Sequence, residues 1–241
     1  MIKVLASGSK GNCYTIQAGG EILLLECGIA WKKGILKGLN FDISNVVGCL
    51  LTHSHLDHSS SIKDVVNSGI DVYSTPEVFQ EIGIGNSVLA YHLLPIQSGK
   101  EFKVGNFTIV PFNCKHTHNN GEECPMVNYL IFHPLIGKIV FITDTFYCKY
   151  VFKGCKHILI ECNYSESILA DLPPYRARLL KSHMSLETLK EALQTWDLKE
   201  TKDITLIHMS ENHGEPDHFR EEIEKVTGVK TIVAVPGLEI N

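Results

Sequence analysis

Apolar residues along the chain fall into short runs that glycine-rich or polar turns separate. The runs at 2–5, 13–16 and 22–25 are typical of strands joined as a meander. The run at 46–51 is continuously apolar, which favours a strand buried on both faces. Similar runs predict further strands at 71–73, 107–110, 129–132, 138–143, 157–161, 204–207 and 231–235.

Between these strands the apolar positions take a helical period. Residues 61–67 and 76–84 predict short helices. Ser185 is suited to cap the start of a longer helix, and Gly228 to end a last helix over 216–226. Strand groups that alternate with helices in two halves predict an α/β sandwich, in which two mixed sheets pack face to face with helices outside. No repeat or linker divides the chain, so we expect one domain over 1–241.

Composition supports a folded protein without membrane segments. Apolar residues make up 44% of the 241 residues and charged residues 20%, which is an ordinary globular balance. No apolar run approaches the roughly 20 residues that cross a bilayer, so we expect a cytoplasmic protein, in the host cytoplasm if a phage encodes it. The eight cysteines form no CxxC pair and mostly lie in apolar runs, which favours buried free thiols over disulfides.

Net charge bears on the partner. The formal charge is −5, and lysine and arginine form no consecutive block. A protein that binds a long nucleic acid usually presents a basic footprint. The balance therefore favours a small anionic nucleotide substrate, with an extended nucleic acid as the alternative.

The segment after the buried strand 46–51 carries the strongest chemical signal. It reads His53-Ser54-His55-Leu56-Asp57-His58, with four residues of metal-ligand type in six positions. In an extended chain the first two histidines point to the same side and can share one metal ion. As the chain turns into a helix, Asp57 and His58 can reach a second ion.

Further ligands must come from the ends of later strands. His116, Asp144 and His208 each follow an apolar run and are the candidates, while His118 competes with His116. Asp144 has two oxygens and can bridge two ions. Asp57 is also a candidate catalytic residue, together with His183, which precedes a helix and could protonate a leaving group, bind phosphate or be structural.

Other candidates are weaker. His213 is a second choice for the proton donor. Arg176, beside Tyr175 and Arg178, could contact a nucleotide or form the solvated face of a connector. The glycine-rich run 7–12 could cradle a phosphate or form a tight strand connection.

The motifs resemble those of the metallo-β-lactamase superfamily, whose HxHxDH signature stands here at His53, His55, Asp57 and His58. Its YycJ/WalJ-like branch is similar over nearly the whole chain, as shown by the segments Leu5-Ala6-Ser7-Gly8-Ser9-Lys10-Gly11-Asn12-Cys13, Ser182-His183-Met184-Ser185 and His208-Met209-Ser210-Glu211-Asn212. Phage anti-Pycsar enzymes, which are cyclic-nucleotide phosphodiesterases, are similar in size and layout.

The resemblance implies an αββα sandwich, a homodimer and two divalent metal ions. One ion would take His53, His55 and His116, the other Asp57, His58 and His208, with Asp144 between them. Nitrogen and oxygen ligands favour Zn²⁺, with Mn²⁺ or Fe²⁺ as alternatives. Glu26 departs from the family, which usually has aspartate there, and we expect it to support the metal loops without binding an ion.

Two metal ions about 3.5–4 Å apart suit phosphodiester hydrolysis. The sequence thus predicts a metal-dependent phosphodiesterase, with cyclic mononucleotides as the preferred substrate. A YycJ-like exonuclease that acts on DNA or RNA ends is the alternative within the enzymes. A metal-binding module without catalysis is the alternative of another class.

Overall fold

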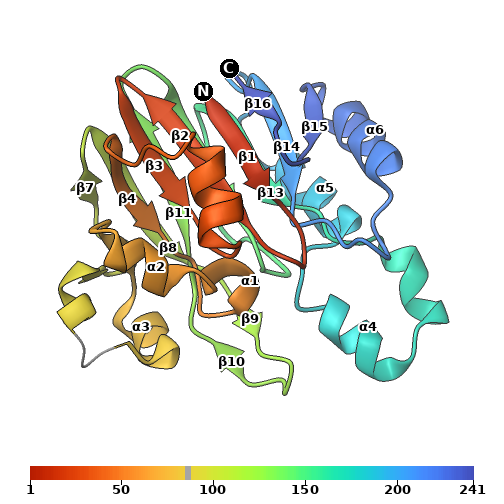
Figure 1. The fold of residues 1–241 in the computed structure, drawn as a ribbon. Coiled ribbons are helices and arrows are strands. Elements are labelled where there is room, and N and C mark those ends of the chain that lie inside the picture. Colours follow the sequence, from red (N-terminus) through yellow and green to blue (C-terminus); the bar gives the residue numbers. More distant parts are fainter. Residues whose placement is uncertain (85–87) are drawn as a thin grey trace.

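The computed structural model describes residues 1–84 and 88–241, in which two seven-stranded sheets are stacked face to face (Figure 1). In the first sheet, β1 to β3 are antiparallel and β3 to β6 are parallel. Its strands in spatial order are Glu239–Ile240 (β16), Ile2–Ala6 (β1), Cys13–Ala18 (β2), Glu21–Leu25 (β3), Val46–Leu50 (β4), Val72–Ser74 (β5) and Leu93–Pro95 (β6).

The second sheet joins a parallel half, β12 to β15, to an antiparallel half. Its strands in spatial order are Thr231–Val233 (β15), Asp203–Ile207 (β14), Cys155–Glu161 (β13), Gly137–Ile142 (β12), Val127–His133 (β11), Phe107–Asn113 (β8) and Phe102–Val104 (β7). A separate hairpin pairs His116–Thr117 (β9) with Glu123–Cys124 (β10).

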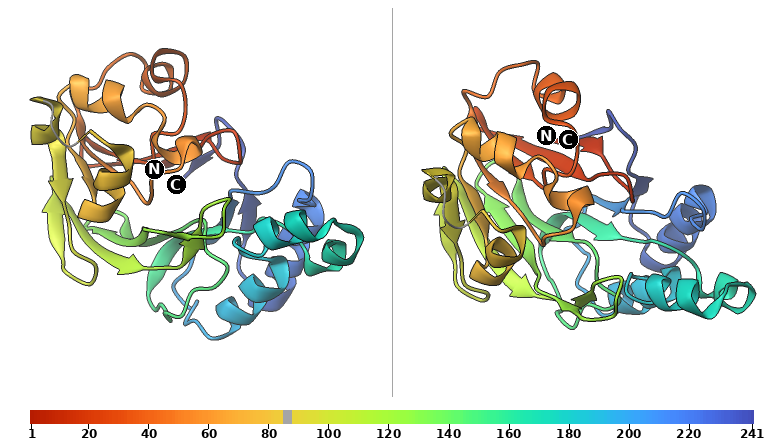
Figure 2. Two further views of the ribbon diagram at one scale, coloured as in Figure 1. Left: turned by 90° about the horizontal axis from the view of Figure 1, so that it is seen from below. Right: turned by 60° about the horizontal axis from the view of Figure 1, so that its bottom comes forward.

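Helices cover the outer faces of the two sheets (Figure 2). Ile62–Asn67 (α2) and Pro76–Ile82 (α3) pack on the first sheet, and Leu186–Gln194 (α5) and Pro216–Thr227 (α6) on the second. Leu56–Ser59 (α1) and Pro174–Leu180 (α4) lie at the rim, in the lower half of Figure 1. Short helical turns occupy Trp31–Leu36, Val88–His92 and Glu166–Asp171.

Three apolar clusters hold these layers together. One lies between the sheets and includes Tyr14, Phe107 and Phe141, all fully buried. The others fill the space between each sheet and its helices. All eight cysteines are free and seven are buried, as the sequence predicted. No helix in the described residues is long and apolar enough to cross a membrane.

The predicted αββα sandwich is confirmed, and so are both helix caps. The Ser185 hydroxyl accepts the Thr188 N–H at 3.1 Å, and Gly228 ends α6 with a φ of 68°. The β9–β10 hairpin was not predicted, because two-residue strands are too short to show a period. Helix α4 was not predicted either, since its segment was interpreted as a connector.

Candidate metal centre

The predicted ligands come from segments that follow strands at one edge of the sandwich. The first four follow β4, Asp144 follows β12, and His208 follows β14. Because parallel strands end at the same edge, residues far apart in sequence meet there. Asp144 and His208 both have a φ of 51°. Such strained backbone in non-glycine residues is concentrated at functional sites.

His53, His55 and His116 form the first group. They offer ligand atoms that lie within 4.8 Å of one another, and His55 Nδ1 is 3.3 Å from His116 Nε2. His53 is fully buried: its Nδ1 lies 2.8 Å from the Thr52 hydroxyl, and its Nε2 has no hydrogen-bond partner. A buried nitrogen without a partner fits a metal ion, because leaving it unsatisfied is costly.

Asp57, His58 and His208 form the second group. Asp57 Oδ2 is 3.3 Å from His58 Nε2 and 3.2 Å from His208 Nε2. Both histidines are buried, whereas the Asp57 side chain is 25% exposed. Asp57 is therefore the member of this group whose carboxylate is accessible to solvent.

Asp144 lies between the two groups. Its Oδ2 is 3.1 Å from His58 Nε2, and its Oδ1 is 3.8 Å from His116 Nε2. The two oxygens of one buried carboxylate thus face different groups of imidazoles. Thr143 steadies the side chain by donating its hydroxyl to Oδ2 at 2.6 Å.

The electrostatics of the two groups differ. Burial lowers the pKa of His53 and brings the pKa of His116 to about 4, so both imidazoles are neutral near pH 7 and keep a lone pair. Burial would also lower the pKa of His208, but the carboxylates of Asp144, Asp57 and Glu161 raise it to about 10. The second group therefore stabilises positive charge, which suits a cation.

Glu161, at the end of β13, was missed in the sequence. Its Oε1 lies 2.7 Å from His183 Nδ1 and 3.0 Å from His208 Nδ1, while Oε2 accepts the backbone N–H groups of Thr145 and Met184. One fully buried carboxylate thereby orients two histidines. The sequence did contain a signal for Glu161: it is an acidic residue at the end of an apolar run, and Asp144 was found because it follows such a run.

His183 is held at the wall of the pocket. Its ring stacks on that of His208, with centroids 5.4 Å apart. Burial opposes protonation, but Glu161 raises the pKa of His183 above its usual value. With Nδ1 engaged by Glu161, His183 has Nε2 left to exchange a proton with a bound molecule.

Glu26 supports the loop after β4 from behind. It is fully buried with a φ of 64°, and its Oε2 accepts the Thr52 N–H at 3.4 Å and lies 3.6 Å from His58 Nδ1. Burial raises the pKa of Glu26. The glutamate side chain is longer than the usual aspartate and therefore comes close to Nδ1 of His58, the ring nitrogen that does not face Asp57 and Asp144.

His118, the predicted competitor of His116, contacts the far side of His55. His118 Nδ1 is 3.0 Å from His55 Nε2, and His118 Nε2 is 3.1 Å from Glu81 Oε1. A carboxylate can only accept, so His118 Nε2 donates to Glu81 and His118 Nδ1 accepts from His55 Nε2. His55 Nδ1 then keeps its lone pair on the side of His116. His55, His118 and Cys124 also form a group of ligand-type atoms.

The glycine-rich run 7–12 packs against two of the segments that carry candidate metal ligands. Asn12 N–H donates to the Asp57 carbonyl at 2.7 Å, and the Ser7 hydroxyl accepts the His208 N–H at 2.9 Å. Gly28 belongs to the same contact, because a Cβ there would lie 1.7 Å from the Asp57 carbonyl oxygen. These bonds support the interpretation as a tight connection.

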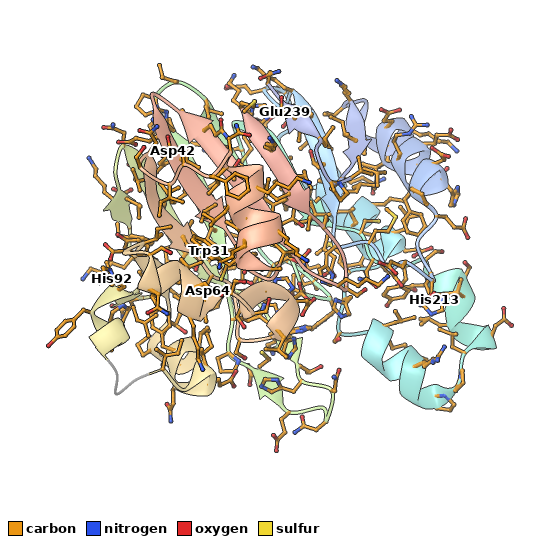
Figure 3. The ribbon with its side chains drawn as sticks, viewed as in Figure 1. Trp31, Asp42, Asp64, His92, His213 and Glu239 are labelled. Carbon is orange, nitrogen blue, oxygen red and sulfur yellow. The ribbon has the colours of Figure 1, made fainter. Side chains whose placement is uncertain are left out.

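The two groups open into a pocket of about 860 Å³, the metal pocket, whose lining includes His55, Asp57, Asp144, His183 and His208. His213 is not in this lining and lies near α4, whereas His92 lies at the other side of the molecule, 2.7 Å from Asp71 (Figure 3). Arg176 is exposed, and the side chains of Tyr175 and Arg178 lie outside the described residues.

Comparison with known proteins agrees with this geometry. The family model described as "Beta-lactamase superfamily domain" matches residues 27–209. The chain belongs to this superfamily. The predicted membership and the prediction of a metal-dependent hydrolase are thereby confirmed at the level of the family, and the His and Asp groups form a site for divalent metal ions.

Individual relatives cover nearly the whole chain. Exodeoxyribonuclease YycJ of Bacillus anthracis is 27% identical over 99% of this chain and 93% of its own length. The metallo-β-lactamase fold protein YhfI from Bacillus subtilis superposes with a TM-score of 0.76 at 19% identity, covering 98% of this chain and 97% of its own. Zn²⁺-bound PqqB from Methylobacterium extorquens gives 0.73 at 15% identity, covering 100% and 99%. The two structures support the fold alone.

Proposed function

We propose that this protein is a dinuclear phosphodiesterase that hydrolyses DNA from an end. The observation that carries the proposal is the placement of Asp144, whose two oxygens face two separate imidazole groups. When bound there, two divalent ions would polarise a phosphoryl group and lower the pKa of water. The full-length similarity to an exodeoxyribonuclease supports DNA as the substrate.

We assign His183 as the proton donor. The alkoxide that leaves a phosphodiester needs a proton, and His183 faces the metal pocket with Glu161 holding its other nitrogen. The raised pKa of His183 keeps the proton available near neutral pH. Asp57, whose side chain is partly exposed in the same pocket, is the candidate group to accept a proton from the attacking water.

The metal we propose is zinc. The two ligand groups on either side of Asp144 offer imidazoles and carboxylates and no thiolate, and such ligands suit Zn²⁺. His53, His55 and His116 would hold one ion, and Asp57, His58 and His208 the other. Mn²⁺ and Fe²⁺ accept the same donors and are the alternatives.

A cyclic mononucleotide is the second candidate substrate. The metal pocket, at about 860 Å³, has the size of a small-molecule site. The net charge of −5 also favours a small anion over a long polyanion.

Hydrolysis of bis-p-nitrophenyl phosphate with Zn²⁺ or Mn²⁺ tests the activity. We expect turnover that is abolished in the double variant His55→Ala with Asp57→Ala. Turnover that survives both substitutions would reject the site. Parallel incubation with single-stranded DNA and with cyclic mononucleotides then decides the substrate: nucleotide release from DNA supports the first proposal, and linear nucleoside monophosphate from the cyclic compounds alone supports the second.

A further inference from the structure

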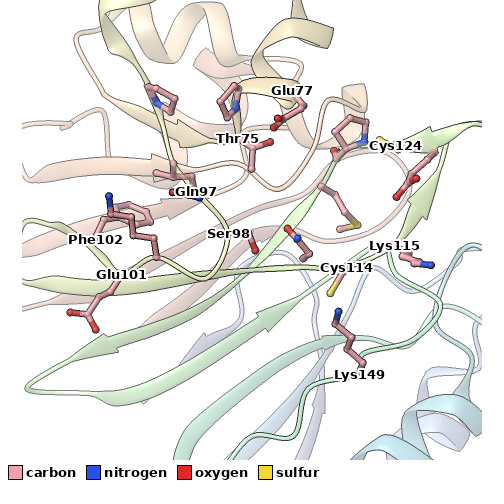
Figure 4. Close-up of a pocket in the computed structure, with 18 of the residues that line it drawn as sticks. Thr75, Glu77, Gln97, Ser98, Glu101, Phe102, Cys114, Lys115, Cys124 and Lys149 are labelled. Carbon is pink, nitrogen blue, oxygen red and sulfur yellow. Dashed lines mark hydrogen bonds between the residues drawn. The ribbon is translucent and has the colours of Figure 1, made fainter.

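A second and larger pocket, the hairpin pocket, lies beside the β9–β10 hairpin and has a volume of about 1190 Å³. Its walls come from the start of α3, the 95–102 loop, the end of β8 and the loop after Asp144 (Figure 4). The metal pocket takes Thr117 and His118 from the same hairpin, whereas the hairpin pocket takes Glu123 and Cys124. The two pockets thus share the hairpin as a wall.

The hairpin pocket begins next to the metal centre. Its lining includes Lys115, which directly precedes His116, and Phe146, which is two residues after Asp144. Consecutive Cα atoms are about 3.8 Å apart, so these wall residues lie within roughly one nucleotide length of candidate metal ligands. A chain whose scissile phosphate lies at the metal centre could continue into this pocket.

The charged groups of the lining are three lysines and three glutamates. The lysines are Lys100, Lys115 and Lys149, and none of them forms an ion pair within the described residues; the Lys149 ammonium lies 5.2 Å from the centre of the Tyr150 ring. In Figure 4, Lys115 and Lys149 flank Cys114, while Glu77 and Glu101 lie on other walls. The third glutamate, Glu123, belongs to the hairpin. Lys115 and Lys149, which lie together beside Cys114, are therefore free to bind phosphates.

Two aromatic side chains complete the wall. Phe146 and Tyr147 are 46% and 49% exposed although both are large. Exposed aromatic rings beside lysines are the combination with which proteins bind single strands, because bases stack on the rings and phosphates pair with the cations.

We propose that the hairpin pocket binds the single-stranded DNA that continues beyond the nucleotide at the metal centre, with Lys115 and Lys149 contacting its phosphates. This inference rests on the proposed phosphodiesterase function and names the substrate as a polynucleotide. A cyclic mononucleotide needs only the metal pocket and would leave these lysines without a role.

The test uses the double variant Lys115→Glu with Lys149→Glu, and the double variant Lys63→Glu with Lys199→Glu as a control. Lys63 and Lys199 are exposed, lie outside both pockets and give the same change in net charge. Fluorescence anisotropy measures binding of a labelled twelve-nucleotide oligothymidylate at several salt concentrations. Hydrolysis of bis-p-nitrophenyl phosphate is measured on the same preparations.

We expect the pocket variant to bind the oligonucleotide at least about tenfold more weakly than the control variant. Loss of two phosphate contacts should also reduce the slope of log affinity against log salt by about 1.4. Phe146→Ala with Tyr147→Ala should weaken binding by at least about fivefold through lost stacking. Hydrolysis of the small substrate should be unchanged in the lysine variants.

Equal binding by the pocket and control variants would overturn the inference, as would an unaltered protein that binds no oligonucleotide. A matched RNA oligonucleotide bound more tightly than DNA would reject DNA as the occupant. Failure of the proposed function looks different, because the unaltered protein would then not hydrolyse bis-p-nitrophenyl phosphate with any metal added.

Discussion

Strands β13 and β14 carry a buried pair of histidine and carboxylate at each end. At the amino ends, His157 Nδ1 lies 2.9 Å from Asp203 Oδ2. At the carboxyl ends, Glu161 lies 2.7 Å from the Nδ1 of His183 and 3.0 Å from that of His208. The residue types and distances are nearly the same, so the pair by itself does not distinguish a functional site from a structural contact.

The surroundings make the difference. His157 and Asp203 are 3% and 6% exposed and satisfy each other without opening to either large pocket. Glu161 instead lies behind residues that face the metal pocket, next to the strained backbone of Asp144 and His208. A site arises where several strand ends bring further carboxylates and imidazoles to such a pair, and where solvent can reach it.

Asp144→Asn should have the largest effect. An amide keeps the size of the side chain but removes the negative charge between the two groups, so we expect at least about a thousandfold loss of phosphodiesterase activity. Metal content measured by elemental analysis should fall in the same variant. Asp203→Asn is the control at the other end of β14, and an equal loss of activity there would contradict the distinction between the two ends.

His183→Asn should reduce activity according to the leaving group. Hydrolysis of a dinucleotide breaks a P–O bond and releases a nucleoside alkoxide that needs a proton, so we expect this reaction to slow by about 10²–10⁴. The p-nitrophenolate of bis-p-nitrophenyl phosphate leaves without a proton and should lose much less. The kcat values for both substrates provide the measurement, and an equal loss on both would exclude proton donation by His183.

Glu81→Gln and His118→Leu should weaken metal binding. They remove the partners that fix which nitrogen of His55 carries the proton, and such outer contacts are typically worth 10–100-fold in metal affinity. Competition with a chelator measures the effect. Glu122→Gln is the control, because Glu122 lies with His118 in the β9–β10 hairpin; this variant should leave the metal affinity unchanged. An unchanged affinity in the first two variants would show that His55 is oriented by other contacts.

His157→Asn should have the smallest effect on catalysis. It leaves Asp203 with a poorer buried partner, so we expect the free energy of unfolding to fall by about 1–3 kcal/mol in urea titration. Activity per bound metal ion should stay the same. A change in metal content or in kcat would mean that the amino ends of these strands also contribute to the site.

The sequence was sufficient to predict the sandwich, because apolar runs of strand length and helical periods are local patterns. It also identified His53, His55, Asp57 and His58, which lie so close together in the chain that their geometry is nearly local. His116, Asp144 and His208 could be found by a simple rule, since each follows an apolar strand. The structure brings all seven of these side chains into adjoining groups.

Tertiary structure decided what local patterns do not contain. Glu161 becomes an orienting carboxylate only because β13 pairs with β14 and places it beside His208, and because the chain returns with His183 many residues later. The hairpin pocket likewise joins walls from α3, β8 and the loop after Asp144. Such contacts depend on which strand ends and loops meet in space, and hydrophobic periodicity fixes only which face of each element is buried.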